Sequence, residues 1–231
     1  GEPVAPFTAE PEGAWWSLAP GAELLTAEDA AATPCPYPGL VTLGADGERS
    51  IVLLNLPSSD VVLLSGSASE VREVCTSLVL EVAMSPWAEQ AEVLAVGFGR
   101  ELPRLMPTAR LRHVPDAAAA ARDLGEWLLE RHQSPGAEHE SWLLVCADSV
   151  TSDEAWQLAE ALAAAPEGKV AMVLPASCGA VFPRGQVWDA APDVEQLIED
   201  VEKDLVLQRM SSTDYQDLLS ALSTTTEPAE P

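Results

Sequence analysis

The chain has 231 residues with 37 acidic and 12 basic side chains, which gives a formal net charge of -25. Nucleic acids and anionic lipid surfaces are bound by clustered Lys and Arg, so we expect neither as a partner. Hydrophobic residues make up 47% of the sequence, which indicates a folded domain and not a disordered chain. No apolar stretch reaches the ~18 residues of a membrane span. We therefore expect no direct membrane insertion of this segment, and no signal peptide.

Composition predicts three parts: an acidic hairpin and linker segment at 1–38, an α/β domain at 39–223, and a flexible linker at 224–231. The segments 1–48 and 189–231 together carry -17 of the net charge. The four cysteines (Cys35, Cys75, Cys146 and Cys178) are far apart in the sequence. This spacing is typical of reduced core cysteines in a cytoplasmic domain.

In chain order, the first expected elements are a hairpin around Pro11-Glu12-Gly13, a helical turn opened by Thr26, and a second hairpin formed by 40–43 and 51–54. Apolar runs then predict buried strands at 61–64, 93–96, 143–147 and 170–174, with short strands at 186–188 and 206–208. Helical periodicity predicts helices at 69–84, 116–131, 153–165, 194–205 and 213–223. The alternation predicts a three-layer α/β fold, with a mainly parallel sheet, helices on both faces and N-terminal β-hairpin elements.

The loop after the strand at 61–64 lies where a phosphate-binding P-loop would lie. A P-loop reads G-x-x-x-x-G-K-[ST], because its backbone amides wrap the phosphates, its Lys neutralises them and its hydroxyl binds Mg²⁺. Gly66 matches the first glycine, but Val71, Arg72 and Glu73 replace the last three residues of the motif. Taken alone, the loop is also an ordinary strand–helix turn with Ser67 or Ser69 as the N-cap.

The strand at 143–147 resembles a Walker B strand, in which two acids follow four apolar residues. In one register Ala147 replaces the metal-linked acid and Asp148 replaces the catalytic one; in the other, Ser149 replaces the catalytic acid. In both registers one carboxylate is missing.

The run 37–44, the hairpin that follows it, the strand ending at Gly66 and the helix to Met84 resemble the core of FtsK/SpoIIIE-type P-loop ATPases. The likeness covers 40–189, so the resemblance implies a P-loop-NTPase-like fold without its catalytic residues. Pro6 to Leu18 and Pro36 to Val41 give a narrower resemblance, to the cytoplasmic segment of large bacterial membrane proteins that also carry a LysM domain and a bacterial transcriptional activator domain. This resemblance implies a cytoplasmic domain of a membrane-anchored protein.

Three other groups of residues are candidate sites. Cys178, after the strand at 170–174, is a candidate nucleophile, although no catalytic-cysteine signature surrounds it. His132 and His139 beside Glu138 and Glu140 form a candidate metal site, for which solvated loop residues are the favoured interpretation. Four arginines (Arg100, Arg104, Arg110 and Arg112) either pair with nearby acids or line the carboxyl-end rim of the sheet and bind an acidic partner.

The sequence thus favours a non-catalytic, pseudo-ATPase-like scaffold or regulatory domain that contacts protein partners or adjacent domains of its own chain. We expect no cofactor and no metal. One alternative is a nucleotide sensor that binds without hydrolysis through Gly66, Ser67, Ser69 and Arg72. Another is a hydrolase that depends on Cys178.

Overall fold

The computed structural model describes residues 6–9, 16–24, 26, 28–29, 35, 37–88, 91–133 and 141–226. The chain divides into two compact units, 1–35 and 36–231. In the first unit, β1 (Phe7–Ala9) and β2 (Trp16–Leu18) pair antiparallel, as the expected hairpin requires. The hydroxyl of Thr26 accepts a hydrogen bond from the amide of Asp29 at 3.1 Å, which is consistent with the helical turn expected there.

A six-stranded parallel sheet forms the centre of the second unit, with the strand order β10-β5-β9-β8-β6-β7. Its strands are β5 (Val61–Ser65), β6 (Ala91–Val96), β7 (Leu111–Val114), β8 (Ser141–Cys146), β9 (Val170–Pro175) and β10 (Gln186–Asp189). Because every pairing is parallel, the carboxyl ends of all six strands lie at one edge. The parallel sheet predicted from the alternating pattern is confirmed.

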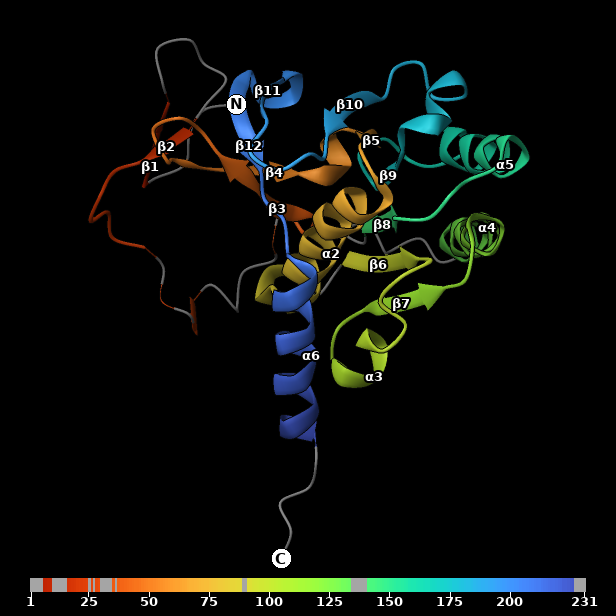
Figure 1. Ribbon diagram of the computed structural model, residues 1–231, viewed down its shortest axis with the longest axis horizontal. Coiled ribbons are helices and arrows are strands. Elements are labelled where there is room, and N and C mark those ends of the chain that lie inside the picture. The colour runs from red at the N-terminus through yellow and green to blue at the C-terminus, as the bar shows by residue number, and fades with distance from the viewer. Residues whose placement is uncertain are drawn as a thin grey trace, which may run out of the picture. The chain divides into compact units, whose positions relative to one another are not determined.

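Helices cover both faces of this sheet (Figure 1). On one face, α4 (Ala117–Gln133) and α5 (Ser152–Ala163) bury Leu124 and Leu158 against strand residues such as Leu94, Leu144 and Met172. On the other face, α2 (Ala68–Met84) contacts β6 and β8. Each fully buried aliphatic side chain contributes roughly 1.5–3 kcal/mol through the hydrophobic effect. The three-layer arrangement therefore rests on apolar burial on both sides of the sheet.

A second, antiparallel sheet has the order β11-β12-β3-β4. Its strands are β3 (Leu40–Ala45), β4 (Ile51–Asn55), β11 (Glu195–Ile198) and β12 (Lys203–Leu207). The β3–β4 pair confirms the hairpin predicted at 40–43 and 51–54. A Cβ at Gly44 would lie 2.0 Å from the carbonyl oxygen of Val206. Glycine is therefore required at this position for β12 to pair with β3.

The helix predicted at 194–205 is wrong, because β11, a short 3-10 helix and β12 occupy this stretch. Its apolar residues have helical spacing, but Leu197 is 60% exposed while Ile198 is fully buried. Glu202, with φ at +47°, turns the chain between the two strands. Pairing of β12 with β3 overrides the local helical pattern, and the strand expected at 206–208 begins three residues earlier, at Lys203.

The sequence pattern also missed β7 and the short helix α3 (Leu102–Leu105) that precedes it. β7 has only four residues, and Arg112 and His113 interrupt its apolar run. Arg112 pairs with Glu92 at 3.0 Å and with Asp123 at 2.5 Å. β7 is an edge strand of the sheet. A charged residue such as Arg112 on an edge strand hinders the pairing of a further strand with that edge.

The remaining elements are short 3-10 helices at Leu56–Ser58, Pro86–Ala88, Ala176–Ala180 and Glu199–Val201, and the final helix α6 (Ser212–Thr226). Within the described part of the chain, no helix has the length and apolarity needed to cross a bilayer.

Residues 208–211, which we call the C-terminal strap, connect β12 to α6 and cross α2. The side-chain amide of Gln208 donates to the carboxylate of Glu81 at 3.2 Å, and the amide of Met210 donates to the carbonyl of Glu73 at 3.1 Å. The Glu81 carboxylate also accepts hydrogen bonds from the amide of Thr42 at 2.8 Å and from its hydroxyl at 2.5 Å. Glu81 thus links α2 to β3 and to the strap.

Replacing Glu81 should destabilise the fold. We expect Glu81→Ala to lower the free energy of unfolding by about 2–3 kcal/mol, because part-buried donors of Thr42 lose a charged acceptor. Urea denaturation measures the change, and Glu126→Ala on the exposed side of α4 should stay within about 0.5 kcal/mol of the parent protein. Equal stability of the two variants would contradict the role assigned to Glu81.

Candidate functional site

The P-loop-like segment is very short in the structure. Only Gly66 and Ser67 separate the end of β5 from the first residue of α2. Gly66 has φ at +138°, where a side chain is strained, and a Cβ there would lie 3.2 Å from the Glu70 carboxylate. The positions that match the end of the P-loop motif lie inside the helix, where Val71 is buried in the core and Arg72 is exposed. There is no extended loop whose amides could surround a phosphate chain.

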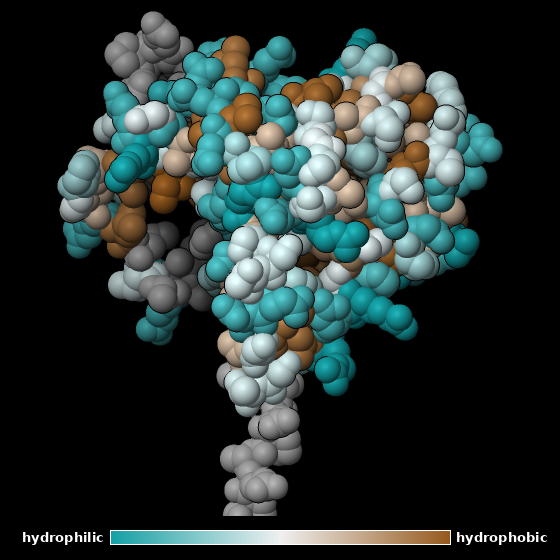
Figure 2. Space-filling view, in the orientation of Figure 1, coloured by the Kyte–Doolittle hydropathy of each residue, from teal (hydrophilic) through white to brown (hydrophobic). Residues whose placement is uncertain are grey.

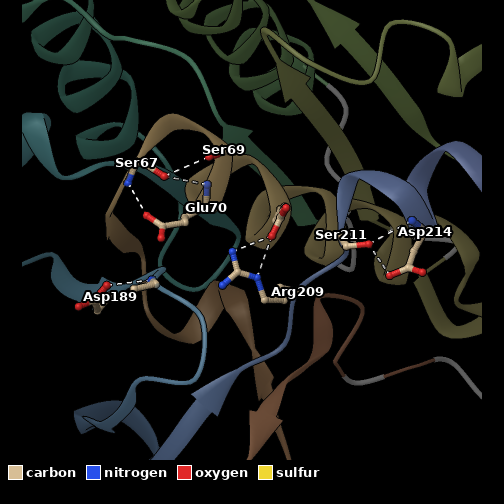
Figure 3. A network of polar contacts seen from close by, with 9 residues as sticks. Ser67, Ser69, Glu70, Asp189, Arg209, Ser211 and Asp214 are labelled. Carbon is tan, nitrogen blue, oxygen red and sulfur yellow. Dashed lines mark hydrogen bonds and ion pairs between the residues drawn. The ribbon is translucent and has the colours of Figure 1, made fainter.

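The amino end of α2 has a capping box, in which the N-cap residue Ser67 and Glu70, three positions later, form hydrogen bonds with each other (Figure 3). The amide of Ser67 donates to the Glu70 carboxylate at 2.7 Å, and the Ser67 hydroxyl accepts from the Glu70 amide at 3.4 Å. The hydroxyls of Ser67 and Ser69 lie 3.1 Å apart. Because unpaired amides and the helix dipole attract anions to a helix start, the Glu70 carboxylate holds the position where a phosphate would bind.

Hydrogen bonds to Ser67 lower the pKa of Glu70 below its ordinary value. The bond to the Ser67 side chain contributes most, the bond to its backbone follows, and the charge of Arg209 adds a smaller effect in the same direction. These interactions favour the ionised carboxylate. Glu70 is therefore a resident anion at the start of α2.

The same arrangement occurs at α5, away from the P-loop-like segment. The amide of Thr151 donates to the Glu154 carboxylate at 2.8 Å, and the Thr151 hydroxyl accepts from the Glu154 amide at 3.3 Å. Both α2 and α5 thus begin with a capping box. Ser67 is the N-cap in the structure, as the strand–helix-turn interpretation of this loop allows.

Glu73, at the position of the magnesium-binding hydroxyl, is paired with the C-terminal strap. Arg209 contacts its carboxylate through Nε at 2.9 Å and through a terminal nitrogen at 2.7 Å. Both side chains are between one fifth and one quarter exposed. The Glu73 carboxylate adds a negative charge at this position, and Arg209 offsets that charge locally.

The Walker-B-like strand ends at the same edge of the sheet. Ala147 is buried and its amide bonds the carbonyl of Val96 at 3.3 Å. Asp148 is exposed, and its carboxylate accepts from the amide of Ser149 at 2.7 Å. A Cβ at Gly97, which follows β6, would lie 2.6 Å from the Cβ of Asp148, so Asp148 lies on the β6 side of β8 and away from the loop at Gly66, which follows β5. The structure brings both motif-like segments to the same edge of the sheet, and Asp148 is the single acid of the second segment.

The four rim arginines do not form one cluster. Arg100 follows the carboxyl end of β6, and Arg104 lies on α3. Arg110 precedes β7, at the opposite edge of the sheet, where its carbonyl accepts from the amide of Val93 at 2.8 Å. Arg112, within β7, forms the two ion pairs described above. Arg100 follows the carboxyl end of a strand, whereas Arg110 precedes the amino end of another and Arg112 lies within it. The structure therefore does not support a single arginine-lined rim.

Cys178 lies in the short 3-10 helix after β9 and is only 2% exposed. Burial raises the pKa of its thiol, as it does for Cys146, where burial raises the pKa to about 12. A reactive cysteine instead requires a lowered pKa and access to substrate. The side chains of His132, His139, Glu138 and Glu140 lie outside the described residues.

Sequence reasoning did not identify Glu70, Arg209 or the contact between α6 and α3. Glu70 was detectable, because Ser67 and Glu70 have the S-x-x-E spacing of a capping box. Arg209 is separated from Glu73 by 136 residues, and nothing local indicates that contact. On α6, the Tyr215 hydroxyl donates to Glu101 at 2.6 Å, and burial together with this carboxylate raises the pKa of Tyr215.

No family model and no curated protein matches this sequence. Among solved structures, the chain is similar to the cytoplasmic domain of the type VII secretion ATPase EccC from Thermomonospora curvata, with 12% identity, a TM-score of 0.48, and coverage of 75% of this chain and 26% of that one. ATPases 2 and 3 of the same EccC, in complex with a signal sequence peptide, give 14% identity, a TM-score of 0.47, and coverage of 84% and 45%.

ATPases 2 and 3 of EssC from Geobacillus thermodenitrificans give 13% identity, a TM-score of 0.47, and coverage of 81% of this chain and 44% of that one. The chain therefore spans about a quarter to just under a half of these solved structures.

Glu70 should make stability depend on pH. Because its pKa is lowered in the folded protein, its charge stabilises the fold above the ordinary glutamate value of 4.5, and this contribution is lost as pH falls through the lowered pKa. We expect Glu70→Gln to melt below the parent protein at pH 7, with the gap closing as pH falls below 4.5. Thermal denaturation in steps from pH 7 to acid tests this.

Glu160→Gln on the exposed side of α5 is the control for Glu70→Gln. A melting-temperature gap for Glu70→Gln that stays constant through the acid range would contradict the electrostatic role of Glu70.

Proposed function

We propose that this chain is a non-catalytic, pseudo-ATPase-like domain that acts as a scaffold or regulator by binding other proteins. The observation that carries the proposal is the start of α2, where the Glu70 carboxylate bonds the amide of Ser67 at 2.7 Å. In a nucleotide-binding loop, such amides are free to bind phosphate oxygens. Here the chain's own carboxylate takes that role.

Three further features argue against phosphate binding at this position. The helix begins two residues after β5, so no loop encloses a phosphate chain. The position of the P-loop lysine is occupied by Arg72, whose side chain is exposed. An incoming phosphate would also meet the negative charge of Glu70 at close range, where repulsion is strongest.

Hydrolysis has even less support than binding. Phosphoryl transfer depends on a positioned metal ion and a residue that orients the attacking water. Asp148 is the single carboxylate of the Walker-B-like segment, and Glu73 replaces the hydroxyl residue and is paired with Arg209. The buried Cys178 gives no better basis for hydrolase chemistry, because its thiol pKa is raised.

Nucleotide titration tests the proposal directly. We expect calorimetry with ATP or GTP and Mg²⁺ to show no dissociation constant tighter than about 100 μM, and phosphate release to stay at the level of the buffer blank. Tighter binding by the parent protein would overturn the proposal, and its loss in Arg72→Ala would assign nucleotide sensing instead.

A matched pair of variants tests the role of Glu70. Glu70→Ala frees the amides at the start of α2, whereas Glu154→Ala frees the equivalent amides of α5, which follows no P-loop-like segment. Nucleotide binding gained in Glu70→Ala alone would mean that Glu70 blocks a remaining site. No gain in either variant would mean that the short loop itself prevents binding.

We also propose that the domain belongs to the cytoplasmic part of a larger bacterial membrane protein with LysM and transcriptional activator domains. The support is the sequence resemblance at Pro6 to Leu18 and Pro36 to Val41. An antibody against this domain should detect, in the membrane fraction of native cells, a protein much larger than 24.4 kDa. A single species of about that mass in the supernatant would contradict this assignment.

A further inference from the structure

A groove of about 1080 Å³ lies between α4 and α5, the two neighbouring helices on one face of the sheet (Figure 1). Its lining residues come from both helices, and most are small or apolar. Figure 2 shows brown and pale residues among the teal ones over the side of the molecule that carries these helices. The groove is separate from the P-loop-like segment, which lies at the carboxyl edge of the sheet.

The spacing of the lining residues gives the groove its shape. On α4 they include Ala118, Ala121, Gly125 and Leu129, which lie on one side of the helix over about three turns, or ~16 Å. On α5 and its C-cap they extend from Gln157 to Ala164, about two turns. A long, shallow groove between two helices fits a third helix, because a helix places residues at the same intervals along its contact face.

Gly125 supports this interpretation independently of the groove's shape. Glycine inside a helix destabilises it relative to alanine, and the backbone at Gly125 does not have the positive φ that would favour glycine. A Cβ at this position would meet nothing within 4 Å. Packing within the described part of the chain therefore does not require glycine, whereas close approach of another backbone would.

The charge on the groove differs from that of the whole chain. The protein carries -25, yet the charged lining residues are Arg122, Arg131 and Glu160, which leave the groove with one net positive charge. Repulsion between an acidic partner and the rest of the chain is screened beyond about 8 Å at physiological salt. An acidic side chain of a partner that contacts the exposed Arg122 directly lies well within this distance, so salt screens their attraction much less.

We propose that this groove binds an amphipathic helix of a partner protein, with small apolar residues over Gly125 and acidic residues beside Arg122. The proposal rests on the interaction function proposed above and names the class of partner. Side chains such as Leu129, which is 64% exposed, would then be covered in the complex.

Two synthetic peptides test the proposal. Each is an 18-residue helix with alanine at the central contact position and leucines one turn before and after it; one carries glutamates along its flank and the other carries lysines. Fluorescence anisotropy should show that the glutamate peptide binds at least about tenfold more tightly than the lysine peptide. No binding of the glutamate peptide up to about 1 mM, or equal binding of both, would overturn the proposal.

Variants of the groove locate the binding. Gly125→Leu should abolish peptide binding while the melting temperature stays equal or rises, because leucine fills the groove and favours the helix. Arg122→Glu should weaken the glutamate peptide at least about tenfold and strengthen the lysine peptide. Arg104→Glu, which makes the same charge change on α3, should leave both unchanged. Unaltered affinity in Gly125→Leu would overturn the proposal.

Nucleotide turnover measured on the same protein separates this proposal from the proposed function. ATP hydrolysis together with peptide binding in the groove would overturn the non-catalytic role and support the groove. Absence of peptide binding together with absence of nucleotide binding would overturn the groove proposal alone.

Discussion

Only two residues separate β5 from helix α2, and hydrogen bonds at the start of the helix hold that start in place. This short connection brings α2 directly onto the sheet, where nine of its residues are buried, including Val71 and Cys75. The same helix contacts β3 of the antiparallel sheet and bonds the C-terminal strap through Glu73 and Glu81. A longer phosphate-binding loop at this point would change the position of the helix to which both sheets and the strap are attached. The packing of α2 and the shortness of the connection before it are therefore linked.

Acidic side chains have two different roles in this molecule. Most of those in the described part of the chain are exposed, whereas Glu70, Glu73 and Glu81 each accept hydrogen bonds from donors on α2, β3 or the strap. The second group contributes to structure because each carboxylate satisfies backbone or side-chain donors that would otherwise be less well paired. Net charge alone would have assigned all of them to the surface.

Much of the fold could be predicted because its signals are local. The apolar run at Val61 to Leu64 and the helical spacing of Val71, Val74, Cys75 and Leu78 reflect burial that a single element can show. The helix predicted from Val194 to Leu205 is wrong because the spacing fits a helix, while β3, the strand with which β12 pairs, lies some 160 residues away. The candidate site divides in the same way. The missing P-loop residues and the Ser67–Glu70 spacing are visible in the sequence, but the pairing of Glu73 with Arg209 depends on tertiary structure.

The pairing of Gly44 with Leu207 also affects the protein while it is being made. At ~5–20 residues per second, a ribosome needs roughly 10–30 s to synthesise the residues between these strands. During that time one edge of β3 has no native neighbour, and β5 likewise waits for β9 and β10. Unpaired edges of this kind are sites where nascent chains associate wrongly. The antiparallel sheet therefore completes its strand pairing only after β12 has been synthesised.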